Sequence, residues 1–148
     1  MTDRIEVVSA AMIRRGGDGI ARLLLGQRRM GGSYPGAWCT PGGKVEASES
    51  DLDALTRELR EEVGLVVDPL RDLLDAVCVY AYDMRSMPTG KPAQVRCYTF
   101  AAPEAFKAQP LDGLIGVGWF SSVELRGLQL APADHAHRDI LRDLNRSV

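Results

Sequence analysis

Three glutamates near the middle of the chain stand at a spacing that could hold a metal ion. Glu58, Glu61 and Glu62 occupy positions i, i+3 and i+4, which lie close together on an α-helix. Each such pair of like charges costs an isolated helix about 0.2–0.5 kcal/mol, so a bound cation is one physical reason to keep them. Carboxylate oxygens suit Mg²⁺, which also takes phosphate oxygens of a substrate. The alternative is a solvated acidic face, balanced by Arg57 and Arg60.

A helix over residues 50–63 is expected to position these glutamates. Its apolar stripe recurs at steps of three and four, and consists of Leu52, Leu55, Leu59 and Val63. Ser50 can cap the first turn, with Asp53 three residues later as a short version of a capping box. Gly64 stands where a left-handed residue commonly ends a helix.

Extended segments are expected on both sides of this helix. Residues 5–13 and 20–25 predict a β-hairpin, followed by a loop over residues 26–36 that is rich in glycine and arginine. Further extended segments are predicted at 37–40, where Pro41-Gly42-Gly43 halts the chain, and at 73–82, 94–101 and 115–120, with a last helix at 134–145. This order predicts an α/β protein with a mixed sheet and helices packed against it.

Composition and charge argue against several classes of protein. The 148 residues are 45% hydrophobic and 26% charged, which is typical of a single globular domain. The net charge of -2 gives no field that attracts nucleic acid, and no apolar run reaches the 18 residues that indicate a membrane span. The cysteines Cys39, Cys78 and Cys97 show no zinc or disulfide pattern, so we expect a cytoplasmic protein.

The segment from Gly43 to Leu65 resembles the signature box of the Nudix hydrolases, G-x5-E-x7-R-E-U-x-E-E-x-G-U, in which U is aliphatic. Nine fixed positions agree without insertion: Gly43, Glu49, Arg57, Glu58, Leu59, Glu61, Glu62, Gly64 and Leu65. The resemblance implies a Nudix-type α/β/α sandwich, with the box helix packed against a mixed sheet. It also implies that one Nudix domain covers residues 1–148.

The same resemblance implies hydrolysis of a nucleoside diphosphate linked to another group, with Mg²⁺ as cofactor and Mn²⁺ as the alternative. The implied metal ligands are Glu58, Glu61, Glu62 and the carbonyl of Gly42. Either Glu58 or Glu61 would be the base for the attacking water. Glu49 and Arg57 would orient the carboxylates. A further acidic ligand is implied in the loop 109–118, where Asp112 is the candidate; the alternative is a solvated loop residue.

Substrate choice depends on residues outside the box. Arg28 and Arg29 resemble family arginines near the phosphates, with ordinary surface arginines as the alternative. Trp38 could stack on a base, although a tryptophan beside a strand end often belongs to the core. Asp134, in Pro132-Ala133-Asp134, resembles a segment through which purine-triphosphate members contact the base, with a cap of the last helix as the alternative.

Two classes of function follow from the sequence. The first is Mg²⁺-dependent hydrolysis of an ordinary, modified or oxidised nucleoside triphosphate to monophosphate and pyrophosphate, with ADP-ribose or a dinucleoside polyphosphate as alternative substrates. The second is a non-catalytic nucleotide-sensing module, although such modules commonly lose box glutamates that this chain retains. The expected partner is a small-molecule nucleotide, with neither nucleic acid nor membrane, and the sequence leaves a homodimer open.

Overall fold

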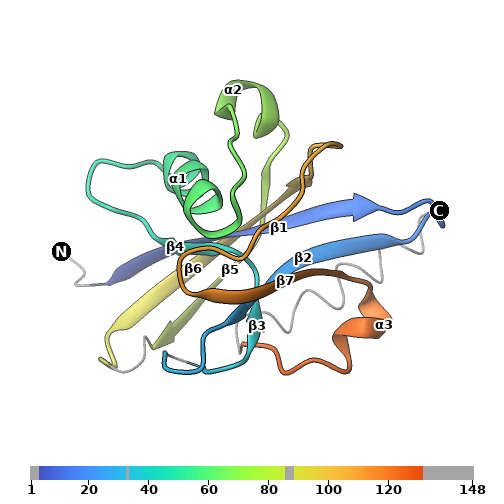
Figure 1. Ribbon diagram of the computed structural model, residues 1–148. Helices are drawn as coiled ribbons and strands as arrows, with labels where there is room; N and C mark the ends of the chain where they lie inside the picture. Colours follow the sequence, from blue (N-terminus) through green and yellow to red (C-terminus); the bar gives the residue numbers. More distant parts are fainter. Residues whose placement is uncertain (1–3, 33, 86–88, 132–148) are drawn as a thin grey trace.

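The computed structural model describes residues 4–32, 34–85 and 89–131. In these residues seven strands form one sheet, and a long helix, α1, crosses one of its faces (Figure 1). The strands are β1 (Ile5–Arg15), β2 (Ala21–Arg28), β3 (Trp38–Cys39), β4 (Gly42–Lys44), β5 (Val77–Arg85), β6 (Pro92–Ala101) and β7 (Leu114–Phe120). The helices are α1 (Asp51–Val63), α2 (Pro69–Asp72) and α3 (Ser122–Leu125). The predicted last helix, 134–145, lies outside the described residues.

The sheet is mixed, as the sequence predicted. Its order is β3-β2-β1-β6-β5, with β4 paired to β1 and β7 paired to β2. β1 and β6 run parallel, whereas the other pairs are antiparallel. One side of β1 pairs first with β4, at Val7–Ser9, and then with β2, at Ile13–Arg15. This change of partner places β4 against α1, and the far end of β2 pairs with β3 and β7 instead of with β1.

α1 forms where the sequence predicted it, because its end signals are local. The Ser50 side chain accepts from the amide of Asp53, and the Asp53 carboxylate accepts from the amide of Ser50. Gly64 ends the helix with a φ of 76°, a left-handed conformation that favours glycine. None of the helices in the described part of the chain has the length and apolar character needed to span a bilayer.

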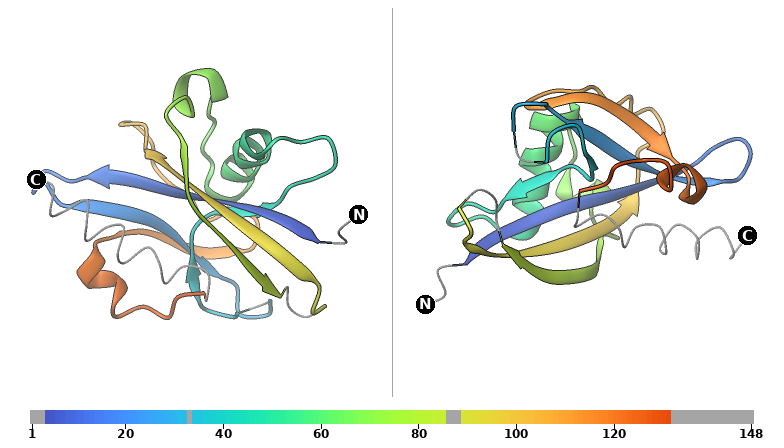
Figure 2. Two further views of the ribbon diagram at one scale, coloured as in Figure 1. Left: turned by 180° about the vertical axis from the view of Figure 1, so that it is seen from behind. Right: turned by 90° about the horizontal axis from the view of Figure 1, so that it is seen from below.

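Apolar side chains cover both faces of the sheet, which makes the fold layered. One cluster packs the stripe of α1 onto Val8, Ala10, Met12 and Leu24. The alternate residues Ala11, Leu23 and Leu25 point to the other face and pack with Leu125 of α3 and with Leu130. Figure 2 shows α1 and α3 on different sides of the sheet. The result is the α/β/α arrangement with the long helix packed against a mixed sheet.

Several expected boundaries were wrong. The strand expected at 73–82 is β5, which begins at Val77 and runs to Arg85. Asp68 caps the short helix α2 with Pro69 in its first turn, and this helix occupies the chain before Leu73. β2 extends to Arg28, into the predicted loop 26–36. Gly42 and Gly43 were expected to end an extended segment, but they belong to β4, which pairs with β1.

Candidate active site

A cavity of about 470 Å³ lies where α1, β4, the end of β2 and the loop before β7 meet. Its lining residues are Arg28, Arg29, Gly32, Gly42, Gly43, Glu58, Glu62, Asp112, Gly113 and Leu114. The cavity therefore collects two of the three predicted metal-binding glutamates, Gly42, both predicted phosphate-binding arginines and Asp112. These residues come from segments that lie far apart in the sequence, such as those of Arg28 and Asp112.

Glu58 and Glu62 form a largely but not fully buried carboxyl pair in this cavity, here called the buried pair. One turn of α1 separates them, and each carboxyl group affects the pKa of the other. Oε1 of Glu62 also accepts from the amide of Gly42 at 2.9 Å. Burial, followed by the charge of Glu58, raises the pKa of Glu62 to about 8, and burial also raises the pKa of Glu58. At neutral pH the pair therefore retains a proton.

Gly43 allows Glu58 to approach the β4 backbone. A Cβ at this position would overlap the Glu58 carboxylate. A Cβ at Gly42 would instead overlap the carbonyl oxygen of Val8 and the backbone of Ser9. The two glycines therefore serve different purposes, since one admits a functional side chain and the other admits the neighbouring strand.

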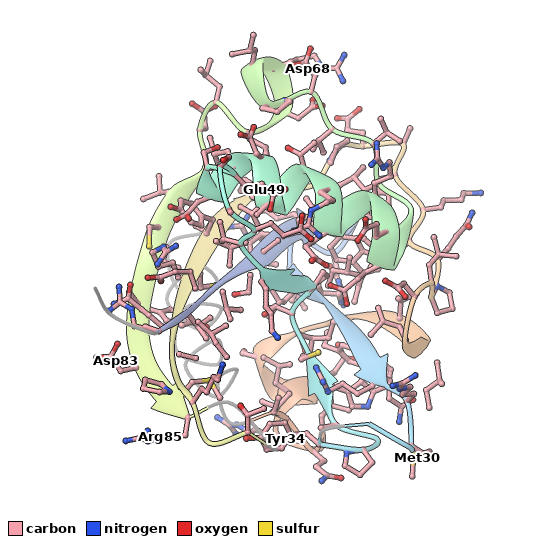
Figure 3. All side chains as sticks on the ribbon, turned by 90° about the vertical axis from the view of Figure 1, so that its left-hand side faces the viewer. Met30, Tyr34, Glu49, Asp68, Asp83 and Arg85 are labelled. Carbon is pink, nitrogen blue, oxygen red and sulfur yellow. The ribbon has the colours of Figure 1, made fainter. Side chains whose placement is uncertain are left out.

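Arg57 connects the segment before α1 to the buried pair. Its Nε and Nη2 donate to the two oxygens of Glu49, both at 2.9 Å, and Nη2 also donates to the Lys44 carbonyl at 2.9 Å. Nη1 donates to Oε1 of Glu58 at 2.8 Å. The hydrogen bonds from Arg57 lower the pKa of Glu49 to about 2, so this ion pair is present at neutral pH. Figure 3 shows Glu49 beside α1, on the segment that leads from β4 into the helix.

Glu61 lies apart from the buried pair. Its Oε2 is 3.5 Å from Nη1 of Arg57, and its side chain is 40% exposed, against 13% for Glu58. It is not among the residues that line the cavity. Among residues 4–32, 34–85 and 89–131, no three His, Cys, Asp or Glu side chains are grouped as a complete metal site.

The residues present nevertheless fit a divalent cation. Burial raises the pKa of both Glu58 and Glu62, and a cation bound to the two carboxylates would compensate the charge that burial disfavours. Two carboxylates are a sufficient protein donor set for Mg²⁺, which completes its shell with water and substrate oxygens.

Arg28 and Arg29 are placed at the cavity by the end of β2. A register irregularity between Gln27 and Arg28 interrupts the pairing of β2 with β7. The amide of Arg29 donates to the carbonyl of Gly113 at 3.1 Å, and the charge of Arg28 acts on Glu62 to lower its pKa, against the stronger effect of burial. Positive and negative side chains thus line one cavity, as the binding of a metal-complexed phosphate would need.

Asp112 is held at the cavity by backbone hydrogen bonds on both sides. The amide of Leu111 donates to the carbonyl of Glu62 at 2.9 Å, while the carbonyl of Gly113 accepts from Arg29. Asp112 itself has a φ of 28°, which is unusual for a residue other than glycine. Backbone strain held by its surroundings is frequent at functional sites. Sequence reasoning named Asp112 but had no signal for these hydrogen bonds.

Trp38 lies outside the cavity lining. Its ring contacts Phe120 edge to face, with centroids 5.0 Å apart, and it packs against the cluster on the face of the sheet opposite α1. Its stacking on a base stays a prediction. Asp134 lies outside the described residues. Sequence reasoning missed three lining residues, Gly32, Gly113 and Leu114. A glycine-rich loop was the available signal for Gly32, and nothing in the pattern marked the other two.

The buried pair predicts that stability depends on pH when divalent cations are removed. The pKa of Glu62 rises from an ordinary value of 4.5 to about 8 on folding, so the folded state binds more protons between these values. The free energy of unfolding should therefore fall as pH rises from about 4.5 to about 8. Carboxyls with lowered pKa, such as Glu49, act below this window.

Urea denaturation at several pH values in EDTA measures this effect. Mg²⁺ should flatten the profile, because the cation replaces the proton, and Glu62→Gln should flatten it in EDTA. A free energy of unfolding that rises across this window in EDTA would show that Glu62 is not protonated in the folded state.

Comparisons with known proteins identify the family of this chain. The model of the NUDIX domain matches residues 4–144. The chain is 51% identical over 61 residues to the CTP pyrophosphohydrolase of Escherichia coli, covering 41% of this chain and 42% of that protein. It is 43% identical over 65 residues to the putative 8-oxo-dGTP diphosphatase 2 of Mycobacterium tuberculosis, covering 44% and 43%. These matches span less than half the length of either curated relative.

Solved structures resemble the chain over nearly its whole length. The solution structure of the Escherichia coli ORF135 protein has a TM-score of 0.72 and 28% identity, covering 99% of this chain and 94% of that chain. The MutT NUDIX hydrolase of Burkholderia pseudomallei has a TM-score of 0.70 and 25% identity, covering 95% and 97%. Because the family model covers almost the entire sequence and the fold agrees, the chain belongs to the NUDIX family.

Proposed function

We propose that this protein is a Mg²⁺-dependent pyrophosphohydrolase that converts a nucleoside triphosphate to nucleoside monophosphate and pyrophosphate. The observation that carries the proposal is one cavity lined by a buried carboxyl pair, Glu58 and Glu62, and by two arginines, Arg28 and Arg29. Carboxylates hold a hard cation, and guanidinium groups bind phosphate oxygens. A polyphosphate bound together with a cation would engage both kinds of group at once. Mn²⁺ is the alternative cofactor.

Glu58 and Glu62 would hold the cation, with the carbonyl of Gly42 and Glu61 as the further ligands. When bound, such a cation neutralises charge on the diphosphate and makes water more acidic. Arg57 fixes the Glu58 carboxylate through Oε1. Because Glu49 holds Arg57 at two points, the guanidinium plane cannot turn without breaking that pair. This arrangement supports a preorganised site.

The remaining polar groups of the cavity would act on the substrate and the attacking water. Arg28 and Arg29 would bind phosphate oxygens and stabilise the charge of the departing pyrophosphate. Either Glu58 or Glu61 would accept the proton of the attacking water. Asp112 would add a further carboxylate from the loop before β7, a role supported by its place in the lining and its constrained backbone.

The choice of nucleoside triphosphate rests on the relatives. They are named for CTP and for 8-oxo-dGTP, so triphosphate is shared between them while the base differs. We propose no base for this chain. A contact of Trp38 or Asp134 with the base, a single domain over residues 1–148 and a cytoplasmic location all stay predictions.

A turnover panel tests the proposal and identifies the substrate. The protein is incubated with Mg²⁺ and equal concentrations of ordinary and oxidised nucleoside triphosphates, ADP-ribose and dinucleoside polyphosphates, and the products are identified by mass spectrometry. Preferential loss of one triphosphate is expected. Preferential hydrolysis of ADP-ribose or a dinucleoside polyphosphate would replace the proposed substrate class. Nucleotide binding with no turnover of any compound would indicate a sensing module instead.

A further inference from the structure

A cluster of polar and charged side chains ties the first turn of α1 to the sheet, away from the cavity. Oδ2 of Asp51 accepts from Nε of Arg96 at 2.7 Å, and Oδ1 accepts from Nη2 of Arg96 at 2.7 Å. Oδ2 also accepts from the Tyr98 hydroxyl at 2.5 Å. Nη1 of Arg96 donates to Glu6 at 2.6 Å. These four residues, here named the Asp51 cluster, join α1 to both β6 and β1.

The Asp51 cluster is less exposed and more directional than an ordinary surface ion pair. The side chains of Asp51 and Arg96 are only 21% and 22% exposed, so water screens their attraction less. The hydrogen bonds from Arg96 lower the pKa of Asp51, while burial and the bond to Asp51 raise the pKa of Tyr98 to about 12. A two-point contact between Arg96 and a carboxylate also restricts direction, which a single ion pair does not.

The helical repeat relates this cluster to the cavity. Asp51 and Glu58 are seven residues apart, which is about 700° of rotation, or about 20° short of two full turns. The two side chains therefore leave α1 in nearly the same direction, about 10 Å apart along its axis, and Glu62 follows Glu58 by one turn. Whatever fixes the direction of Asp51 also fixes the direction of Glu58.

Apolar packing alone would fix this direction poorly. Burial of the leucine stripe is favourable but has no directional preference, so a small roll of α1 changes it little. A roll of about 10° moves a carboxylate that lies about 6 Å from the helix axis by about 1 Å. An error of this size in a catalytic group can reduce a rate by about 100-fold. The hydrogen bonds of Arg57 and Glu62 to the β4 backbone hold the later turns of α1, and the Asp51 cluster is the polar contact that holds its first turn to the sheet.

We infer that Asp51 is a positioning residue, which sets the rotation of α1 through Arg96 and Tyr98 and thereby aims Glu58 and Glu62 into the cavity. The inference rests on the proposed hydrolase function. The ion pair of Asp51 and Arg96 lies outside the cavity but is expected to affect turnover as well as stability.

Asp51→Asn, Arg96→Gln and their double variant test the inference. We expect kcat to fall about tenfold in each single variant, with KM changed less than about twofold, because the arginines that bind phosphate are untouched. The double variant should be no slower than the slower single variant, because both changes remove one interaction. Binding of Mn²⁺ alone, followed by its electron paramagnetic resonance signal, should weaken in the same variants.

Asp18→Asn is the matched control. It removes another two-point contact with an arginine, in which Arg22 donates at 2.7 and 3.1 Å, but this pair lies at the β1–β2 turn. We expect its kcat and Mn²⁺ affinity to equal those of the original chain. Tyr98→Phe keeps the ion pair and removes one hydroxyl, and its kcat should fall about fivefold. This variant tests the inference if Asp51→Asn does not fold.

The inference is overturned if the folded variants of the Asp51 cluster keep full kcat and Mn²⁺ affinity and lose only thermal stability, as Asp18→Asn would. That result would leave the proposed function intact. Absence of both turnover and Mn²⁺ binding in the unsubstituted protein would instead overturn the proposed function, and the inference with it.

Discussion

Glu62→Gln is expected to reduce kcat by about 1000-fold, which is the scale of losing one preorganised electrostatic contact in an active site. Glutamine has nearly the same shape and keeps an oxygen that can accept from the amide of Gly42. It cannot supply the negative charge that a divalent cation needs. Because the pKa of Glu62 is raised to about 8, the neutral glutamine resembles the protonated form that the metal-free protein already holds at neutral pH.

This variant should therefore lose activity without losing stability. Thermal unfolding in EDTA at pH 7 should give a Tm at least equal to that of the original chain, while added Mg²⁺ should no longer raise it. Glu104→Gln, at an exposed position, is the matched control and should behave as the original chain in both assays. A Glu62→Gln protein with kcat within twofold of the original would exclude Glu62 from the metal site.

Gly43→Ala is expected to lose activity while keeping its fold, whereas Gly42→Ala is expected to lose stability. At Gly43 the new methyl group would meet the Glu58 carboxylate, the end of a flexible side chain that can move aside. The fold should persist, and displacement of the carboxylate by about 1 Å should reduce kcat by about 100-fold. At Gly42 the methyl group would meet the backbone of Val8 and Ser9, which cannot move without opening the β1–β4 pairing.

Gly42→Ala should consequently lose about 3 kcal/mol of the free energy of unfolding, the upper end of the cost of overpacking. Urea denaturation and kcat, measured for both variants at a temperature where each is folded, separate the two effects. Equal losses of stability, or a Gly43→Ala protein with full activity, would mean that the close approach of Glu58 to β4 does not matter for the reaction.

The parts of the fold that could be predicted are those fixed by neighbouring residues. α1 was predicted closely because its cap, its stripe and its terminal glycine all lie between Ser50 and Gly64. The pair Glu49 and Arg57 could be inferred because it belongs to the same short box, and the structure joins them by two hydrogen bonds. Arg28 and Arg29 were found only through the family resemblance, since nothing in their spacing requires them to meet Glu62.

The parts that could not be predicted depend on contacts between distant segments. In the sequence, Gly42 and Gly43 look like the end of an extended segment, but pairing with β1 makes them part of a strand. Asp112 is brought to the cavity by hydrogen bonds to the end of α1 and to Arg29, which leave no trace in the local sequence. Asp51 and Arg96 are 45 residues apart, so the ion pair between them could not be recognised from either segment alone.

The most direct test of the proposed function asks which phosphate bond is broken and whether breaking it requires the cation. A nucleoside triphosphate taken from the turnover panel is followed by ³¹P nuclear magnetic resonance, first with Mg²⁺ and then after an excess of EDTA. We predict growth of the monophosphate and pyrophosphate signals, stopping when EDTA is added. Release of orthophosphate and a nucleoside diphosphate, or hydrolysis that continues in EDTA, would contradict a metal-dependent pyrophosphohydrolase built on Glu58 and Glu62.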